Sequence, residues 1–293
     1  MDATVFETLL DLALREDLGG RGDVTSLAIF SESDVCSARL VCKDSGVLCG
    51  VECFSGVFGK VDSSASVRLL VSDGELLSPG SEVALVAGRT RSILQAERTA
   101  INFLSFLSGI ATAASSYARA AREKGRALVL DTRKTLPGYR ALSKYAVRVG
   151  GGKNHRHGLH DMILIKDNHI DAAGGIPEAI RRVRSVWGRE FQVEVECRNV
   201  EEVRQAIEAG AEIVMLDNMD YGVARDAIAL RKDGVLFEAS GGVSLETAGD
   251  WSALGVDYIS VGRMTHSVRS LDFSLTMVQG GDRWIRGRQN STS

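Results

Sequence analysis

The strongest constraint on the fold is a series of short apolar segments that starts after Gly125 and recurs as far as residue 262. Segments with a helical pattern separate them, and the last four apolar segments start about 21–23 residues apart. This spacing is typical of a strand followed by a helix, and repeated units of this kind with apolar strands form parallel sheets. The predicted strands are 127–131, 162–166, 191–196, 212–217, 235–240 and 257–262.

Two arrangements of such a sheet are open, a β/α barrel and a doubly wound sheet. The even spacing of the strands favours the barrel. In addition, the dinucleotide-binding motif G-x-G-x-x-G, which marks many doubly wound sheets, does not follow the first strand. We therefore expect an α/β protein whose parallel strands build a β/α barrel.

The N-terminal part of the chain follows other patterns. Residues 5–18 have apolar positions at helical spacing and are followed by two glycines, which end a helix. Residues 36–90 alternate apolar with small or polar residues and contain turn signals, which indicates a small β-rich module. A long helical pattern follows from about residue 92. The chain is long enough for one large domain or two smaller ones.

The composition, with 44% hydrophobic and 25% charged residues among 293, is that of a globular protein. No apolar run reaches the length of a membrane span, and the acidic N-terminus is unlike a signal peptide, so we expect a cytoplasmic protein without a membrane partner. The five cysteines include no C-x-x-C pair, which argues against a zinc site and a disulfide framework. The formal net charge of -3 argues against nucleic acid as a partner.

Residues 131–169 form a basic island in this mildly acidic chain. They include eight Lys or Arg residues, only three acids, and four of the five histidines. A solvated helix face could also be rich in cations. Here, however, the cations lie in tight clusters beside apolar runs and next to Gly150–Gly152. This order favours a focused site for a small, multiply anionic ligand.

Each predicted strand ends in polar residues that its apolar body does not need. In a β/α barrel the carboxyl ends of all strands meet at one face, and that face carries the chemistry. The candidates at these ends are Thr132, Arg133, Lys134, Lys166, Glu196, Asp217, Ser240, Gly241, Gly242, Gly262 and Arg263, with His155 and Arg156 in the loop between the first two strands.

The chemistry of these groups indicates their roles. The cations, among them Arg133 and Arg156, could clamp carboxylates, which arginine binds with two hydrogen bonds. His155 and His169 could donate hydrogen bonds to an anion, and they lack the spacing of a metal site. No P-loop and no G-x-S-x-G motif is present.

The remaining candidates suggest a phosphate and a metal. Glycines after the last two strands would expose backbone N–H groups where barrels often bind phosphate, although tight turns also need glycine. Glu196 and Asp217 could hold Mg²⁺ together with ligand phosphates, or could be ion-pair partners of the basic residues. Together these features indicate transfer or rearrangement of a phosphorylated sugar, with a second anionic substrate.

Residues 131–170, DTRKTLPGYRALSKYAVRVGGGKNHRHGLHDMILIKDNHI, resemble the signature region of quinolinate phosphoribosyltransferases, also called carboxylating nicotinate-nucleotide diphosphorylases. The resemblance extends in order over nearly the whole chain, through REDLGGRGDVTS, ERTAINFLSFLSGIAT, VEVECRNVEE, VMLDNM, ASGGVS and GVDYISVGRMTHS. It implies that quinolinate and phosphoribosyl pyrophosphate react, with Mg²⁺, to nicotinate mononucleotide, pyrophosphate and CO₂ in NAD synthesis.

The resemblance also implies an architecture. It predicts an open β/α barrel, residues 113–270, beside an N-terminal α/β sandwich domain, residues 1–112. The C-terminal segment, about 271–293, is expected to pack back on the sandwich. The polar tail after about Gly280 matches nothing in the family, and we expect it to be disordered.

Motif by motif, the resemblance implies roles for single residues. Lys134, Glu196 and Asp217 are the implied catalytic residues, with both carboxylates near the ribose and in direct or indirect contact with the metal. Arg98 matches an arginine that the family donates to the neighbouring subunit, which implies a homodimer. The implied substrate-binding set is Arg98, Thr132, Arg133, Lys134, His155, Arg156, Lys166, Glu196, Asp217, Ser240, Gly241, Gly242, Gly262 and Arg263.

Two alternatives stay open at this point. A paralogue of the same fold could act on another base, such as nicotinate. A protein without catalytic activity could bind anions or nucleotides as a regulator. The pair Glu196 and Asp217 argues against the regulator, because a binder of anions gains nothing from two carboxylates in its site.

Overall fold

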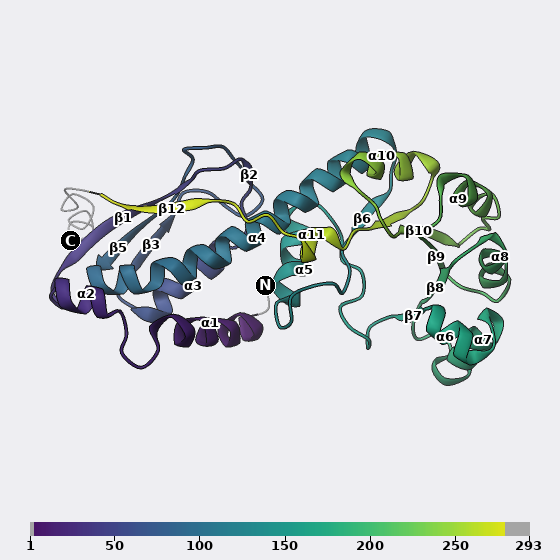
Figure 1. Ribbon diagram of the computed structural model, residues 1–293, viewed down its shortest axis with the longest axis horizontal. Coiled ribbons are helices and arrows are strands. Elements are labelled where there is room, and N and C mark those ends of the chain that lie inside the picture. Colours follow the sequence, from purple (N-terminus) through teal and green to yellow (C-terminus); the bar gives the residue numbers. More distant parts are fainter. Residues whose placement is uncertain (1–2, 279–293) are drawn as a thin grey trace, which may run out of the picture. The chain divides into compact units, whose positions relative to one another are not determined.

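The computed structural model describes residues 3–278, which fold into two compact units (Figure 1). Among the described residues, the first unit consists of 3–112, 137–150 and 268–278, and the second of Ala113–Leu136 and Gly151–Ser267. Helix α4, Thr90–Lys124, contributes to both units. The polar tail, for which we predicted disorder, lies outside the described residues.

An antiparallel sheet in the order β12-β1-β5-β3 is the centre of the first unit. The C-terminal strand β12 returns to pair with β1, so that Phe273 lies opposite Cys42. The elements of this unit are α1 (Ala3–Leu18), α2 (Val24–Ile29), β1 (Val35–Cys42), β2 (Gly46–Val47), α3 (Val51–Val61), β3 (Ser66–Leu69), β4 (Leu76–Leu77), β5 (Glu82–Arg89), α5 (Arg140–Val149) and β12 (Phe273–Met277), together with the first part of α4.

Large apolar side chains fill the core of this unit. Phe54 and Phe58 of α3 are almost fully buried, and Phe6 of α1 meets Phe103 of α4 edge to face at 5.4 Å between ring centroids. Because α1 presents its apolar residues at helical spacing, it buries one stripe and leaves the other side exposed. The predicted helices at 5–18 and from about 92 thus correspond to α1 and α4.

Helix α5 lies between two barrel strands in sequence but clusters with the first unit. The Tyr145 hydroxyl donates to the Asp73 carboxylate at 2.7 Å. The Tyr139 ring, just before α5, stacks on Phe103 with centroids 5.9 Å apart. These aromatic contacts explain why residues 137–150 separate from the barrel sequence that surrounds them.

The second unit contains a parallel sheet of six strands in the order β6-β11-β10-β9-β8-β7. Its strands lie where the alternating pattern predicted them, as β6 (Leu128–Leu130), β7 (Ile163–Ile165), β8 (Val193–Cys197), β9 (Ile213–Asp217), β10 (Leu236–Ser240) and β11 (Tyr258–Ser260). Within the described chain, β6 and β7 end the sheet and do not pair with each other. The expected open β/α barrel with a separate N-terminal α/β unit is therefore confirmed.

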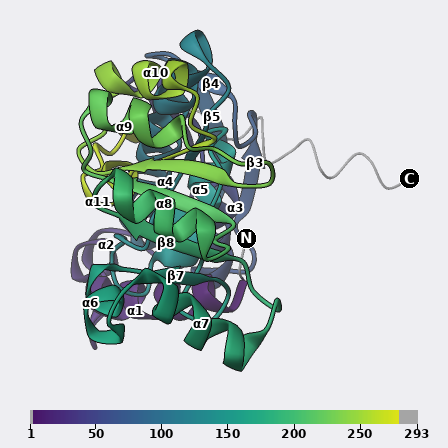
Figure 2. The same cartoon turned by 90° about the vertical axis from the view of Figure 1, so that its right-hand side faces the viewer.

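Helices cover the outside of this sheet. In Figure 1 the strands β7 to β10 follow one another with helices on their outer side, and Figure 2 turns these helices toward the viewer. The helices are α6 (Asp167–Ala173), α7 (Ile176–Trp187), α8 (Val200–Glu208), α9 (Tyr221–Ile228), α10 (Leu245–Leu254) and α11 (Arg263–His266).

Polar side chains cap several of these helices and so fix the residue at which each helix begins after its strand. Asn199 caps α8, since its side chain accepts a hydrogen bond from the N–H of Glu202 at 3.0 Å. Asp220 caps α9 in the same way, accepting from the N–H of Val223 at 2.9 Å.

Among residues 3–278, no helix combines the length and the apolar character that crossing a bilayer would require.

Candidate active site

A pocket of about 370 Å³ opens where the strands of the second unit end. Thr132 follows β6, Lys166 follows β7, and Asp217 and Ser240 are the last residues of β9 and β10. The carboxyl ends of parallel strands meet at one edge, which explains why residues so distant in sequence share this pocket. Its lining residues are Thr132, Arg133, Lys134, His155, Arg156, Leu164, Lys166, Glu196, Met215, Asp217, Ser240 and Ser260.

Arg156 supplies a cation with little contact to water, and the half-buried Arg133 lies near it. Arg156 is only 9% exposed, and burial lowers the pKa of its guanidinium. The charge of Arg133 lowers that pKa further, whereas the charges of Glu194, Asp161 and Glu196 oppose the shift. Two neighbouring guanidinium groups, one of them buried, favour a ligand with more than one negative charge.

Lys166 and Glu196 form an ion pair within this pocket. The ammonium group lies just after β7, and the carboxylate lies on the neighbouring strand β8. The predicted alternative for Glu196, an ion-pair partner of the basic cluster, is therefore found in the structure. Asp217 accepts a hydrogen bond from the side-chain amide of Asn218 at 3.0 Å. The pocket is thus lined by both basic and acidic side chains, and the basic side chains outnumber the acidic ones.

Backbone conformation and close neighbours explain why glycine occupies the positions after β10 and β11. Gly241 has a φ of 92°, and a Cβ there would lie 2.2 Å from Oδ1 of Asn218. Gly242 also has a positive φ, of 62°. At Gly262 a Cβ would meet Cδ of Lys134 at 3.1 Å, so this glycine allows the lysine to pass close to the backbone.

The predicted residues outside the pocket lining lie in two places. Gly241, Gly242, Gly262 and Arg263 directly follow strands whose last residues line the pocket, and Arg263 is exposed at the start of α11. Arg98 is an exposed residue of α4 in the first unit. The other candidates, from Thr132 to Ser240, are brought together in the lining.

Hydrogen bonds hold the loop segments that carry the cations. Asp131, fully buried at the end of β6, accepts from the N–H of His155 at 3.0 Å and from the side chain of Asn154. The Thr265 hydroxyl donates to the carbonyl oxygen of Lys134 at 2.8 Å. No sequence pattern predicted these roles of Asp131 and Thr265, because their partners are distant in the chain or belong to the backbone.

The two histidines that we considered as hydrogen-bond donors to an anion have different partners in the structure. His155 lines the pocket, but its Nε2 lies 2.9 Å from a carboxylate oxygen of Glu194 and 3.6 Å from one of Glu238. The Nδ1 atom of His169 instead accepts from the N–H of Lys166 at 3.0 Å and completes the capping of α6. His169 therefore serves the helix start.

The sequence patterns assigned no role to Glu194 or to Glu238. Glu194 lies two residues before Glu196, and Glu238 two residues before Ser240. Because alternate residues of a strand point to the same side, these positions share the inward face with the pocket residues. A glutamate inside an otherwise apolar strand was the available signal.

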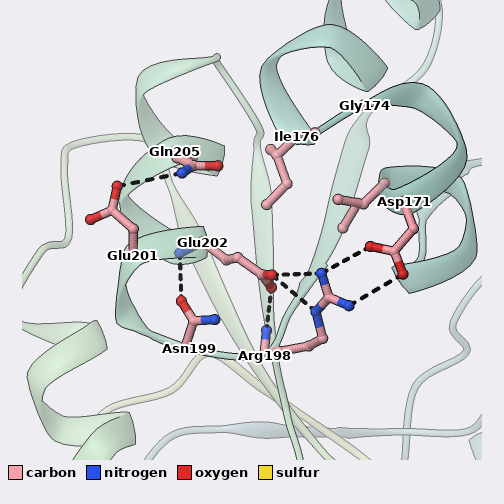
Figure 3. A pocket seen from close by; sticks show the side chains of 10 residues that line it. Asp171, Gly174, Ile176, Arg198, Asn199, Glu201, Glu202 and Gln205 are labelled. Carbon is pink, nitrogen blue, oxygen red and sulfur yellow. Dashed lines mark hydrogen bonds and ion pairs between the residues drawn. The ribbon is translucent and has the colours of Figure 1, made fainter.

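A second pocket, of about 600 Å³, lies between the starts of α7 and α8 (Figure 3). Arg198 projects into it and pairs with Asp171 at 3.2 Å and with Glu202 at 2.8 Å. Glu201 adds another acid to its rim. Since acids surround Arg198, this pocket does not suit an anionic substrate.

Comparison with known proteins gives one consistent result. The family model for the C-terminal domain of quinolinate phosphoribosyl transferase matches residues 110–276, and that for the N-terminal domain matches residues 23–108. A probable carboxylating nicotinate-nucleotide pyrophosphorylase of Bacillus subtilis (strain 168) is 41% identical over 275 residues, which is 94% of each chain.

Solved structures agree with the sequence matches. The crystal structure of NadC from Streptococcus pyogenes superposes with a TM-score of 0.90 at 39% identity, covering 95% of this chain and 99% of that one. The nicotinate-nucleotide pyrophosphorylase from Francisella tularensis gives a TM-score of 0.90 at 36% identity, covering 95% and 98%.

Proposed function

This chain belongs to the quinolinate phosphoribosyltransferase family, and from that premise we propose that the pocket at the strand ends of its barrel is the active site. The chain carries out the family's reaction. Phosphoribosyl passes from phosphoribosyl pyrophosphate to quinolinate, CO₂ is lost, and nicotinate mononucleotide and pyrophosphate form in the de novo synthesis of NAD.

One observation supports the site above all others. Several cations and two carboxylates from different strands line the same pocket. Quinolinate carries two adjacent ring carboxylates, which need more than one cation. We assign this task to Arg133, Arg156 and Lys166, with Thr132 beside them, while His155 supports the backbone of Arg156. The low solvation of Arg156 strengthens its attraction for a carboxylate.

Glu196 and Asp217 act on the other side of the reaction in this proposal. When pyrophosphate leaves, the ribose develops positive charge at C1, and nearby carboxylates stabilise that charge. Carboxylate oxygens also suit Mg²⁺, which supplies charge neutralisation at the departing pyrophosphate. Asp217 is the better direct ligand, because Glu196 is held by Lys166. Glu196 then acts on the metal indirectly.

The phosphate groups are assigned to the glycine turns. Gly241, Gly242 and Gly262 leave backbone N–H groups uncovered, and Ser240 and Arg263 flank these turns. Together they would hold the 5′-phosphate. Lys134 lies against Gly262 and supplies a cation on the phosphoribosyl side, which makes it the third catalytic residue of the proposal.

Decarboxylation needs no dedicated acid or base. Once its nitrogen is ribosylated, the pyridine ring is cationic and stabilises the electron pair that remains at C2 when CO₂ departs, and C2 then takes a proton from water. The task of the protein is then to hold the ring and its remaining carboxylate in place. We assign this holding role to the same cations that bind quinolinate.

Two further parts of the proposal concern the protein as a whole. We infer a homodimer in which Arg98 serves the site of the partner subunit, which agrees with its exposed position on α4. A cytoplasmic location agrees with the five free cysteines.

An assay with Mg²⁺ and phosphoribosyl pyrophosphate tests the function. Quinolinate should yield nicotinate mononucleotide and one CO₂ per turnover, and nicotinate should yield neither at a comparable rate. Faster turnover of nicotinate would identify a paralogue acting on another base. Binding of phosphoribosyl pyrophosphate without turnover of either base would identify a regulator.

A further inference from the structure

A cluster of buried titratable groups lies beneath the pocket. Glu194 and Glu238 are 0% and 1% exposed, and both carboxyl groups approach Nε2 of His155. The three groups offer atoms that all lie within 4.8 Å of one another. Among the described residues, both carboxylate oxygens of Glu194 and Oε1 of Glu238 have no hydrogen-bond partner, although Oε2 of Glu194 lies 2.9 Å from Nε2 of His155. Buried acids of this kind are costly and therefore require an explanation.

The position of the ring proton on His155 follows from the hydrogen bonds. The backbone N–H of Arg156 donates to Nδ1 of His155 at 2.7 Å, so this nitrogen supplies a lone pair. The ring proton is then on Nε2, which faces Glu194 at 2.9 Å. The imidazole thus links the buried carboxyl group of Glu194 to the backbone of Arg156.

The charges of the two glutamates cannot be equal. Two carboxylates that meet at one ring nitrogen in a sealed interior do not both ionise. Burial raises the pKa of Glu238 well above its usual range, and the charge of Glu194 raises it further. Glu238 is therefore a neutral acid, while the charge of Glu194 favours the guanidinium form of Arg156.

We propose that Glu194 and Glu238 are positioning residues of the quinolinate site, which hold the imidazole of His155 and, through its Nδ1, the backbone of Arg156. The inference rests on the proposed role of Arg156 in binding quinolinate. In this arrangement Glu194 accepts the Nε2 proton, and the neutral Glu238 closes the cluster without adding a second buried charge.

A divalent cation is the other occupant that such side chains could hold. Coordination would require the lone pair of Nε2, but that nitrogen carries the proton. Moving the proton to Nδ1 would bring it against the N–H of Arg156. The hydrogen bonds therefore favour a proton-holding cluster over a metal site.

Steady-state kinetics of the full-length enzyme test the proposal with Glu194→Leu, Glu238→Leu and Glu238→Gln. Both leucine variants should raise KM for quinolinate about tenfold or more and leave KM for phosphoribosyl pyrophosphate within about twofold. Glutamine imitates a neutral acid, so Glu238→Gln should restore KM for quinolinate to within about threefold of wild type.

Glu212→Gln is the matched control. Glu212 accepts from the N–H of Val193 at 2.7 Å and pairs with Arg184, before the start of β9 and away from the pocket. This variant should lose stability without a change in either KM. A rise in both KM values for the leucine variants, or a Glu238→Gln variant as impaired as Glu238→Leu, would overturn the proposal.

Two more measurements separate this inference from the function on which it rests. Arg156→Ala should also raise KM for quinolinate, and no rise in that variant would reject the proposed site itself. If Arg156→Ala raises KM and Glu194→Leu does not, only the positioning role fails. Nitrogen NMR of labelled histidine in the wild type, assigned with His155→Asn, should show the proton on Nε2, and a proton on Nδ1 would also reject the inference.

Discussion

The ammonium group of Lys166 pairs with the carboxylate of Glu196 across the neighbouring strand ends of β7 and β8. The pair joins the two halves of the proposed site, the cations that bind quinolinate and the carboxylates that face the ribose. It is partly exposed, so its own contribution to folding is small. Its importance is that each partner holds the other in position.

Removing either of two cations should stop catalysis without unfolding the protein. We expect Arg133→Ala and Lys166→Ala each to lower kcat/KM for quinolinate by about 100-fold or more, because a ring carboxylate loses its partner. Circular dichroism and thermal unfolding should match the wild type within a few degrees. Near-normal activity in both variants would reject the assigned site.

The two carboxylates should respond differently to magnesium. Asp217→Asn should raise the Mg²⁺ concentration needed for half-maximal rate by about tenfold or more, because a direct ligand is weakened. Glu196→Gln should mainly lower kcat. Chelation of Mg²⁺ should abolish turnover of the wild type. Titration of Mg²⁺ in each variant measures this, and identical curves for both variants would contradict separate roles.

Arg98 provides a test of the proposed dimer. Arg98→Ala and Lys166→Ala should each be nearly inactive alone. If Arg98 serves the partner subunit, a mixed dimer contains one intact site, and random mixing of the two variants should restore about a quarter of wild-type activity. Activity is measured after mixing and subunit exchange. No recovery despite exchange, shown by mass-tagged chains, would reject the shared site.

The raised pKa of Glu238 predicts how stability depends on pH. The folded protein binds this proton more tightly than the unfolded chain, so the free energy of unfolding falls as pH rises above about 4.5, the ordinary value for glutamate. The fall continues until the pH passes the folded pKa. Because a glutamine side chain does not titrate, Glu238→Gln should gain stability relative to wild type by up to about 1.4 kcal/mol per pH unit.

Urea unfolding of both proteins between pH 5 and 8 measures this difference. The titratable groups that face Glu238 are Glu194 and Glu196 of β8 and His155, which lies in the loop before β7. Glu212→Gln serves again as the control, since its carboxylate is paired with Arg184. A difference between Glu238→Gln and wild type that stays constant with pH would show that Glu238 is ionised in the folded protein.

Gly241 tests the tightest of the glycine turns. An added Cβ would lie 2.2 Å from Asn218 Oδ1, and the residue has a positive φ. Gly241→Ala should therefore cost about 1–3 kcal/mol of stability and raise KM for phosphoribosyl pyrophosphate more than KM for quinolinate. Gly234→Ala, also at positive φ but with open space around it, is the matched control and should leave both KM values unchanged.

The sequence by itself determined the strands of the barrel and most of the pocket lining. Strand–helix alternation is a local pattern, and carboxyl ends of parallel strands must meet at one edge. For that reason the sequence alone was enough to place Arg133, Lys166, Glu196 and Asp217 together, as the pocket lining confirms. The long basic motif identified the family for a related reason, since its residues are contiguous in the chain.

Only the tertiary structure decided how deeply each of these side chains is buried and with which residue it pairs. Alternation puts Glu194 and Glu196 on the same face of β8, but Glu194 is fully buried, whereas Glu196 lies nearer the strand end and lines the pocket. The pairing of Lys166 with Glu196, and the approach of His155 to Glu194, join separate segments through space. Such distances depend on how strands and loops pack, which no local pattern of residues encodes.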